Sequence, residues 1–553
     1  MMKLVLAQLN YIVGDIEGNL QKILAVYQNI SRDNALLICT ELALTGYYPQ
    51  DLIYKKSVLK RQQEALKRLT AATRGKACAI VIGYIAGNND SAGKGLFNAL
   101  ALLSKGVQVF EYHKRLLPTY NVFDEARHFS PGSNSGIFRY KGRQLGFLIC
   151  EDAWAKSNSL IYAHDPVKEL KQHQLDLVIC INASPNNLGK MQERLAIVSK
   201  VVKQLNAPLV YVNQVGGNDE LVFDGGSFVM NRAAGLAYKM ATFEEQVGEI
   251  EFAAIHSQKA VYLAPSDSEL ILNQTVLGIR DYVHKCAFSK VVIGSSGGID
   301  SAVTLAICSA ALGGGNVTAI TMPSQYSSQG SVNDSALLCR NLGVALLTAP
   351  IKKEFELAVK QFTLMTGEKP SGLTRENMQA RIRGRILMEY SNHFGALVIS
   401  TGNKSEMSVG YATLYGDMNG GINPLGDLYK MEVYALAKFI NEKAQKDIIP
   451  DTVIKKAPSA ELSEGQVDSD SLPEYPLLDA ILKLYIEGDL LDAQESQQCE
   501  QIIKRFEPSP EDILKIHKMV DRAEFKRRQA PPIIRVQKRS FGMGRWLPVA
   551  AKY

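Results

Sequence analysis

A turn rich in glycine and serine joins an apolar strand to an apolar helix in the segment KVVIGSSGGIDSAV, residues 290–303. Small residues let backbone amides approach an anion closely, and the positive N-terminal end of the following helix points at the same place. Ser295, Ser296 and Ser301 add hydroxyl donors, and Asp300 is suited to holding Mg²⁺ against a phosphate. The turn lacks the G-K-[ST] ending of a Walker A loop. A plain capped turn would explain the glycines but not the whole S-G-G-x-D-S string, so the pattern predicts a phosphate site.

Three cysteines are candidate nucleophiles because each closes an apolar run. Cys39 ends ALLIC, Cys180 ends DLVIC, and Cys150 ends LGFLIC and precedes Glu151 and Asp152. A thiol at a strand end beside polar groups can form a thiolate and meet a substrate, whereas a reduced cysteine in an apolar run is ordinary core. The spacing alone does not choose among the three. Since the chain has no C-x-x-C pair, we expect neither disulfides nor structural zinc.

The segment EFKRRQAPPIIRVQKRS near the C-terminus concentrates positive charge. It is consistent with a solvated tail or with a clamp on phosphates or acidic groups. The predicted phosphate site favours the clamp. The cations concerned are Lys526, Arg527, Arg528, Arg535, Lys538 and Arg539.

Composition narrows the class of protein. With 553 residues, of which 46% are hydrophobic and 21% charged, the chain has ample apolar surface for about two large domains. A net charge of +6 is small for this length, so binding to nucleic acid is not indicated. The N-terminus does not read as a signal peptide, and no apolar stretch reaches about 18 residues. We expect a cytoplasmic protein without a membrane partner.

Short β-rich runs alternate with helical stretches such as 17–30, 50–70 and 189–205 in the first part of the chain. Pairs such as LFNALALLS with VQVFEYH indicate hairpins. This order suits an α/β fold in which two sheets are covered by helices on their outer faces. We place this domain at residues 1–255.

After an expected linker at residues 256–275, strands and helices alternate regularly from 290 to about 445. Such alternation predicts a doubly wound, Rossmann-like parallel sheet, and ligands of these sheets bind at the carboxyl ends of the strands. The predicted phosphate turn follows one such strand. We assign residues 276–553, including the basic tail, to this second domain.

The S-G-G-x-D-S string resembles the pyrophosphate loop of the N-type ATP pyrophosphatases, which adenylate a substrate and release pyrophosphate. Residues 374–392 and 400–437 resemble the NAD synthetases of that group. The resemblance implies ATP as co-substrate, with Thr401 among its contacts, and Mg²⁺ held by Asp300 and Glu406. It implies that deamido-NAD contacts Asn377, Glu406 and Lys526. The loop residues it assigns to ATP are Gly294, Ser295, Ser296, Gly297, Gly298, Ile299, Asp300 and Ser301.

The first domain resembles the nitrilase (carbon–nitrogen hydrolase) superfamily in three segments, TELALTGYYPQD, EYHKRLLPTYNVFDEARHF and LGFLICEDAW. The resemblance implies an αββα sandwich in which Glu41 is the general base, Lys114 stabilises the oxyanion, and Cys150 is the nucleophile. It also implies a glutamine site, although a turn or helix-cap role is open for each of its members. These are Tyr120, Glu125, Ser184 and Lys190.

Together the two resemblances imply a member of the glutamine-dependent NAD synthetases. Its first domain would release ammonia from glutamine, and its second would amidate the adenylated carboxylate of deamido-NAD. The resemblance further implies a homo-oligomer and an ammonia channel. One departure is LPEY at 472–475, where the family pattern is LPPY. Two alternatives stay open, a different acceptor for the ammonia and a nucleotide-binding regulator without activity.

Overall fold

The computed structural model describes residues 2–30, 33–88, 93–155, 162–459 and 461–551. The chain divides into two compact units, Met1–Ala264 and Pro265–Tyr553, which are considered separately. Helix α6 (Asp267–Lys285) lies near the start of the second unit, so the latter part of the range expected as linker is helical. Within the described residues, every helix is too short or too polar to span a bilayer.

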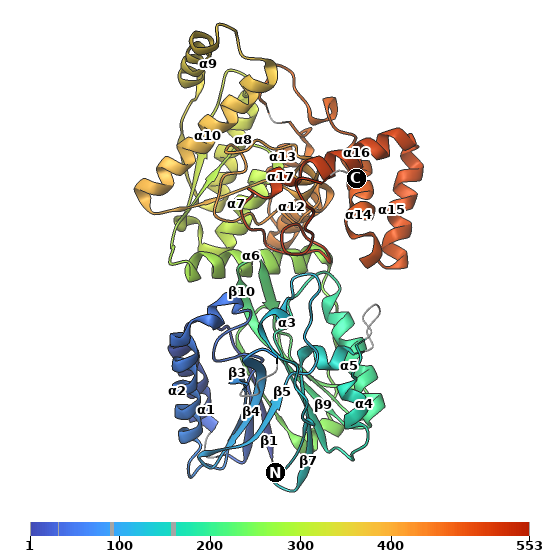
Figure 1. Ribbon diagram of the computed structural model, residues 1–553. Helices are drawn as coiled ribbons and strands as arrows, with labels where there is room; N and C mark the ends of the chain where they lie inside the picture. The colour runs from blue at the N-terminus through green and yellow to red at the C-terminus, as the bar shows by residue number, and fades with distance from the viewer. Residues whose placement is uncertain (1, 31–32, 89–92, 156–161, 460, 552–553) are drawn as a thin grey trace. The chain divides into compact units, whose positions relative to one another are not determined.

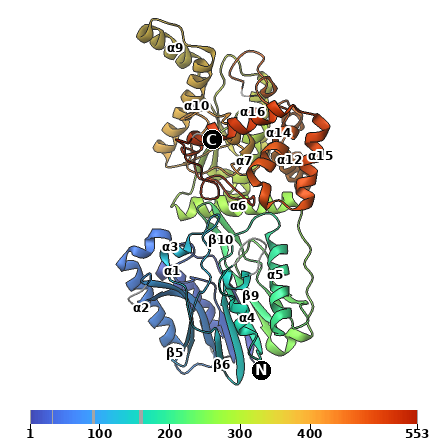
Figure 2. The ribbon, with the colours of Figure 1, turned by 45° about the vertical axis from the view of Figure 1, so that its right-hand side comes forward.

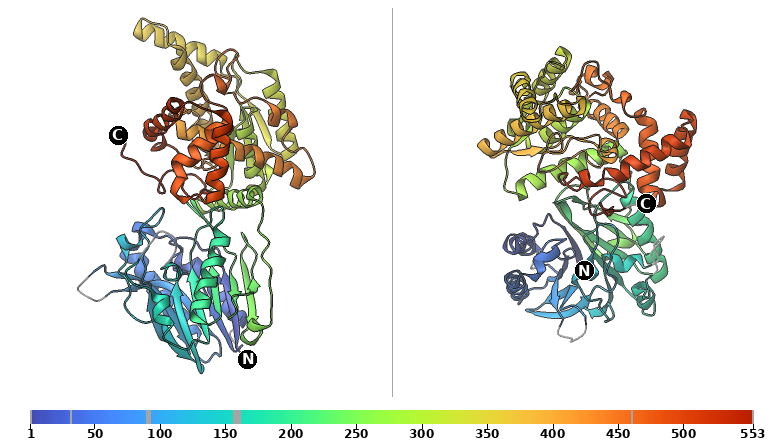
Figure 3. Two further views of the ribbon diagram at one scale, coloured as in Figure 1. Left: turned by 90° about the vertical axis from the view of Figure 1, so that its right-hand side faces the viewer. Right: turned by 45° about the horizontal axis from the view of Figure 1, so that its top comes forward.

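The first unit is a four-layer sandwich of helices, sheet, sheet and helices (Figures 1 and 3). One sheet has the order β14 (Gln246–Glu251), β1 (Lys3–Gln8), β2 (Ala35–Ile38), β3 (Ala79–Gly87), β4 (Leu96–Ser104), β5 (Val107–His113). The other has the order β13 (Leu236–Lys239), β12 (Phe228–Met230), β9 (Leu209–Asn213), β8 (Leu177–Asn182), β7 (Arg143–Ile149), β6 (Ile137–Tyr140). A separate ribbon pairs β10 (Val215–Asn218) with β11 (Leu221–Asp224). The predicted hairpin of β4 and β5 is confirmed.

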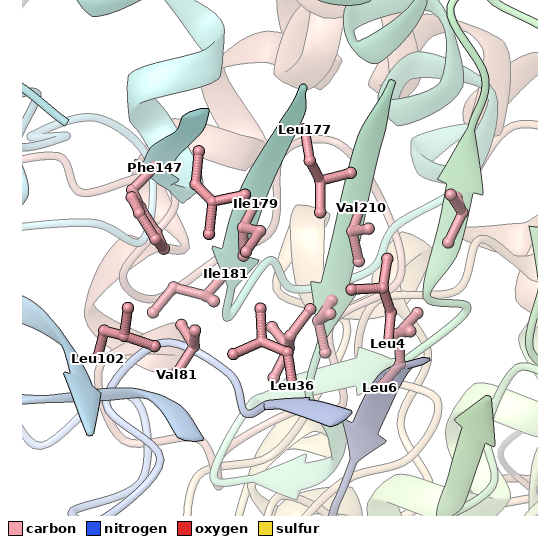
Figure 4. Close-up of a cluster of buried hydrophobic side chains, with 14 of the residues drawn as sticks. Leu4, Leu6, Leu36, Val81, Leu102, Phe147, Leu177, Ile179, Ile181 and Val210 are labelled. Atoms are coloured by element: carbon pink, nitrogen blue, oxygen red, sulfur yellow. The ribbon is translucent and has the colours of Figure 1, made fainter. Parts of the chain in front are cut away.

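The core of this unit lies between the two sheets. Figure 4 shows Leu4, Leu36 and Val81 of the first sheet facing Ile179 and Val210 of the second. Side chains on the other faces of the same strands pack against the outer helices, as the two-residue period of a strand requires. These helices are α1 (Ile16–Ile30) and α2 (Lys56–Ala72) on one side and α4 (Pro166–Leu170) and α5 (Lys190–Leu205) on the other. The expected αββα sandwich is confirmed.

The second unit contains a four-stranded parallel sheet in the order β17 (Ala345–Thr348), β16 (Val317–Thr321), β15 (Val291–Gly294), β18 (Leu397–Ile399). The chain moves outward from β15 to β17 and then returns to pair β18 with the other edge of β15. This reversal is a topological switch point, where open parallel sheets bind ligands at their carboxyl ends. The expected doubly wound sheet is confirmed, with the predicted phosphate turn directly after β15.

Helices surround this sheet and extend beyond it. Figure 2 shows α9 and α10 reaching away from the rest of the unit, and α14, α15 and α16 gathered together. The helices are α7 (Ile299–Leu312), α8 (Gln329–Leu342), α9 (Lys352–Thr366), α10 (Gly372–Phe394), α11 (Lys404–Val409), α12 (Lys430–Ala444), α13 (Asp451–Lys455), α14 (Tyr475–Glu487), α15 (Ala493–Phe506), α16 (Pro510–Arg522) and α17 (Glu524–Arg527). After α17 the chain returns to the sheet region, where Ile533 forms a parallel bridge with Asn423.

Candidate active sites

Three residues predicted in the first unit converge although they are far apart in the sequence. Glu41 follows β2, Lys114 follows β5, and Cys150 opens the 3-10 helix η2 (Cys150–Trp154) after β7. The ammonium of Lys114 lies 2.7 Å from Oε1 of Glu41 and 2.7 Å from Oε1 of Glu125. The charges of Glu41 and Lys114 both act on the Cys150 thiol. The fold therefore assembles an acid, a cation and a thiol in one buried cluster.

The carboxylate of Glu41 is fixed by three separate segments. The amide of Asn98 on β4 donates to Oε1 at 2.8 Å, and the backbone N–H of Ala183, after β8, donates to Oε2 at 2.9 Å. Lys114 supplies the third contact. Because these donors come from both sheets, the carboxylate has one orientation.

Burial and charge set the protonation of the cluster. Burial raises the pKa of the Cys150 thiol well above its usual value, and Glu41 raises it further against the opposing effect of Lys114. Burial alone would lower the pKa of Lys114, but Glu125 and Glu41 raise it well above its usual value. The site at rest thus holds a neutral thiol and a charged ammonium. Cys150 also has a φ of 43°, a left-handed conformation that side chains adopt at a cost and that is frequent at functional turns.

Glu151 is a member of this site that sequence reasoning missed. The hydroxyl of Tyr120 donates to its two carboxylate oxygens at 3.2 and 3.1 Å, and the hydroxyl of Tyr162 donates to Oε1 at 2.7 Å. Burial raises the pKa of Glu151. Its position directly after Cys150 was the available signal, but the sequence does not show that two tyrosines meet it.

The other predicted glutamine contacts lie on neighbouring elements. Ser184 is buried in the turn between β8 and α5. Lys190 begins α5, and its ammonium lies 2.9 Å from Oε2 of Glu193 and 4.2 Å from the centre of the Trp154 ring. The Tyr47 hydroxyl donates to Glu125 at 2.8 Å, so Glu125 is held against the Lys114 ammonium.

A cavity of about 440 Å³ lies in the second unit at the carboxyl end of β15. It is in the size range of pockets for small ligands. Thr401, Asn377, Glu406 and Lys526 line it. The predicted loop residues that also line it are Gly294, Ser295, Ser296, Gly298, Ile299, Asp300 and Ser301.

Gly297 is the loop residue that faces the protein instead of the cavity. Its φ is 78°, and a Cβ at this position would lie 2.4 Å from the carbonyl oxygen of Ser331. A glycine is therefore needed for the loop to pass over the start of α8. Gly298 is the N-cap of α7, which directs the positive end of that helix into the loop.

Two carboxylates predicted to hold Mg²⁺ meet at one lysine. The ammonium of Lys430 lies 2.6 Å from Oδ2 of Asp300 and 3.0 Å from Oε1 of Glu406. Asn403 joins the same group, because its amide donates to Oδ1 of Asp300 at 3.0 Å and its oxygen caps α11 through the Glu406 N–H at 3.0 Å. Burial raises the pKa of Glu406 to about 7, with Lys430 opposing and Asp300 adding to the rise. Lys430 was missed from the sequence, where it is one lysine among many.

The donor set of Asp300 and Glu406 fits Mg²⁺, which prefers carboxylate and phosphate oxygens. Both carboxylates reach one ammonium, so they are close enough to share one cation. Among the described residues no cluster of three or more acidic, histidine or cysteine side chains is arranged to hold a metal. A magnesium ion here would take its remaining ligands from phosphate oxygens and water.

Four of the six cations of the basic tail pair with carboxylates, which corrects the clamp expectation for them. Arg527 and Arg528 both pair with Glu524 at 2.9 Å. Lys538 pairs with Glu495 at 2.7 Å, and Arg539 pairs with Asp489 at 2.7 Å. Lys526, in contrast, lines the cavity, with its ammonium donating to the carbonyls of residues 410 and 412 at 2.8 and 2.7 Å. Lys538 and Arg539 thus pair with distant acidic residues through the charges that the sequence left available for phosphates.

Known protein families match both units. A family described as carbon–nitrogen hydrolase matches residues 3–259, and one described as NAD synthase matches residues 271–530. With the buried cluster around Cys150 and the glycine loop after β15, these matches define a carbon–nitrogen hydrolase joined to an NAD synthase.

Relatives over the whole chain give the more particular assignment. The glutamine-dependent NAD(+) synthetase of Synechocystis is 42% identical over 100% of this chain and 99% of its own length. That of Acinetobacter baylyi is 40% identical over 99% of this chain and 98% of its own. The solved glutamine-dependent NAD+ synthetase of Acinetobacter baumannii, in complex with ADP, is 38% identical, with a TM-score of 0.76 over 99% and 98% of the two chains. The chain belongs to the glutamine-dependent NAD(+) synthetase family, as its motifs predicted.

Proposed function

We propose that this protein makes NAD from deamido-NAD, ATP and glutamine, with Cys150 of the first unit releasing the ammonia that the second unit consumes. The observation that carries the proposal is the convergence of Glu41, Lys114 and Cys150 in one buried cluster. An amidase belongs in such a protein because ammonia is mostly ammonium at neutral pH, and ammonium is not a nucleophile. Family membership supports the same activity.

The glutaminase step uses the neutral thiol and the fixed carboxylate. Glu41 accepts the thiol proton as the sulfur of Cys150 attacks the side-chain amide of glutamine. The charged Lys114 stabilises the negative oxygen that forms on the amide carbon. The proton then passes to the departing nitrogen, which leaves as ammonia, and a thioester remains on the sulfur. Water, activated by Glu41, hydrolyses the thioester to glutamate and restores the thiol.

Recognition of glutamine is assigned to the polar groups around this cluster. The carboxylate of Glu151, together with the hydroxyl of Tyr120, suits the α-ammonium group of the substrate. Ser184 and Lys190 suit its α-carboxylate. Glu125 is the second carboxylate that holds the Lys114 ammonium in place.

The synthetase step takes place in the cavity of the second unit. The amides of the 294–301 loop, the N-terminus of α7 and Thr401 bind ATP, while Asn377, Glu406 and Lys526 bind deamido-NAD. The nicotinate carboxylate attacks the α-phosphorus of ATP, and pyrophosphate leaves against the loop. Ammonia then attacks the acyl-adenylate, releasing AMP and a proton and leaving the amide of NAD. The ADP bound to the relative from Acinetobacter baumannii supports a nucleotide site in this fold.

Asp300 and Glu406 are the residues that would hold Mg²⁺ with the phosphates. When bound, the ion neutralises charge that develops on the pyrophosphate. Lys430, which contacts both carboxylates, keeps them together and balances part of their charge. Homo-oligomerisation, an ammonia channel and a cytoplasmic location stay predictions from the resemblance.

The test supplies ATP, Mg²⁺ and deamido-NAD with either glutamine or ammonium. Cys150→Ala is expected to lose glutamine-driven amidation and to keep ammonium-driven amidation, because it removes the nucleophile and leaves the second unit intact. Cys39→Ala is the matched control, since Cys39 is also a buried cysteine after an apolar strand. The assignment would be contradicted if Cys150→Ala kept glutamine-driven turnover. It would also be contradicted if Cys39→Ala lost that turnover while Cys150→Ala kept it.

A further inference from the structure

A short buried turn, residues 183–186 between β8 and α5, contacts the proposed general base and also contributes to the proposed glutamine pocket. Its first residue, Ala183, donates its N–H to the Glu41 carboxylate at 2.9 Å. Its second, Ser184, is a proposed glutamine contact. On one side the turn is held by Asn213 of β9, which accepts the Ser184 N–H at 2.8 Å and donates to the Ser184 carbonyl at 3.1 Å.

On the other side the same turn is held by a guanidinium that no solvent reaches. Arg194 of α5 is 0% exposed. Its Nη2 donates to the carbonyl of Ser184 at 2.7 Å and to that of Pro185 at 3.2 Å, and its Nε donates to the Ser184 hydroxyl oxygen at 3.2 Å. Its Nη1 lies 2.6 Å from Oδ1 of Asp224 on β11. The Arg194 side chain thus makes four polar contacts, and three of them are with the turn.

Burying the Arg194–Asp224 ion pair costs desolvation free energy, which suggests that the pair has a role beyond stability. A buried ion pair is often replaceable by apolar residues without loss of stability, so stability alone is a weak reason to keep one. Asp224 neutralises the charge, while the planar fork of the guanidinium fixes two carbonyls and a hydroxyl at once. A lysine in this place would supply the charge but could not reproduce the fork.

We infer that Arg194 is a positioning residue for glutamine, which sets the place of the Ser184 hydroxyl in the substrate pocket. This inference rests on the proposed function, and in particular on Ser184 as a glutamine contact. Arg194 acts through Ser184, because its hydrogen bonds and ion pair are with the turn and Asp224. Its charge also acts on the Cys150 thiol, and Arg194→Lys keeps that charge. Asn213 still holds the Ser184 backbone when Arg194 is changed, so the catalytic carboxylate of Glu41 keeps its Ala183 contact. The effect is therefore expected in the binding of glutamine more than in turnover.

The main variant is Arg194→Lys, assayed for glutamine-driven and ammonium-driven amidation. We expect KM for glutamine to rise at least tenfold, kcat with glutamine to stay within threefold of the parent, and the ammonium-driven rate to be unchanged. Arg68→Lys is the matched control, because Arg68 also pairs with a carboxylate, at 2.7 Å from Glu17, but is 51% exposed. Its KM for glutamine is expected to equal that of the parent.

Ser184→Ala and the double variant test whether Arg194 acts through Ser184. Ser184→Ala should raise KM for glutamine, and adding Arg194→Lys should raise it no further, since the two changes remove the same contact. A general structural role would give multiplied effects instead. Asp224→Asn is the second route if Arg194→Lys does not fold. It leaves an oxygen to accept the hydrogen bond but removes the counter-charge, and we expect a smaller rise in KM of the same kind.

Cys150→Ala is run alongside these variants to separate the two claims. If Cys150→Ala keeps glutamine-driven amidation, the proposed function is refuted. If Cys150→Ala behaves as expected but Arg194→Lys has the parent's KM, or a lower kcat at the parent's KM, only the role of Arg194 is overturned. Multiplied effects in the double variant overturn it as well.

Discussion

Among the described residues of the second unit, the most buried ion pair gives a prediction whose size can be worked out. The ammonium of Lys404 is 0% exposed and lies 2.9 Å from Oδ1 of Asp427 and 3.1 Å from Oε1 of Glu487. It also donates to the carbonyl of Arg539 at 2.8 Å. The other oxygen of Asp427 accepts three hydrogen bonds from the segment 536–540. Lys404→Met keeps the volume of the side chain and removes its charge.

The loss of stability follows from what the change leaves behind. Oδ1 of Asp427 would have no partner among the described residues, and removing one partner of a buried pair typically costs about 3–5 kcal/mol. A carboxylate can escape this cost by binding a proton. At pH 7 that escape costs about 4 kcal/mol for an acid that titrates near 3.9 in the unfolded chain, at about 1.4 kcal/mol for each pH unit. The expected loss is therefore about 4 kcal/mol at pH 7 and about 2 kcal/mol at pH 5.5.

Amide hydrogen exchange reports this loss at the place where it occurs. The N–H groups of Val536 and Gln537 donate to Asp427 at 2.8 and 2.7 Å, so they are protected while the pair is intact. A loss of about 4 kcal/mol corresponds to about a thousandfold faster exchange at pH 7. Lys455→Met is the control, because Lys455 pairs with Asp451 on the surface and is 76% exposed. A change below about 1 kcal/mol, or an equal loss at the two pH values, would refute the reasoning.

Two further predictions concern the glycine loop and the turn that follows Cys150. Gly297→Ala should lower kcat/KM for ATP at least tenfold, because its Cβ would lie 2.4 Å from the Ser331 carbonyl oxygen. Gly313→Ala is the control, since Gly313 has a similar φ of 81° but nothing within 4 Å of a Cβ, and it should leave ATP kinetics unchanged. Equal effects of the two substitutions would argue against the close approach at Gly297. Burial raises the pKa of Asp152 to about 6, so the folded state binds the extra proton as the pH falls below that value. The parent should therefore lose about 3 kcal/mol relative to Asp152→Asn as the pH rises from about 4 to about 6. Urea unfolding of the first unit at several pH values measures this slope, and a slope of the opposite sign would contradict it.

The sequence predicted those parts of the molecule that local pattern determines. The strand and helix on either side of the 294–301 loop were expected because an apolar run, a turn of glycine and serine, and a second apolar run follow one another. The residues of this loop line the cavity, with the exception of Gly297. Cys150 was expected at the end of an apolar strand, whereas Glu41 and Lys114 were named from the resemblance to the nitrilase superfamily. The sandwich brings Glu41 and Lys114 together in one ion pair beside Cys150.

The parts that sequence reasoning missed depend on contacts between distant residues. Lys430 lies between Asp300 and Glu406, but nothing near it in the chain distinguishes it from a solvated lysine. The tail cation Lys538 pairs with Glu495 on α15, which only the packing of the helices brings near. Charge and spacing alone show that a side chain is available for a role, whereas the fold decides which opposite charge it meets.

The carboxylate of Glu41 belongs to one sheet by its place in the chain and to the other by its hydrogen bond to Ala183. Because this one carboxylate is bonded to both sheets, a shift of one sheet against the other would disturb the proposed general base. Glutamine hydrolysis should therefore be lost early when the first unit loosens, before its strands separate.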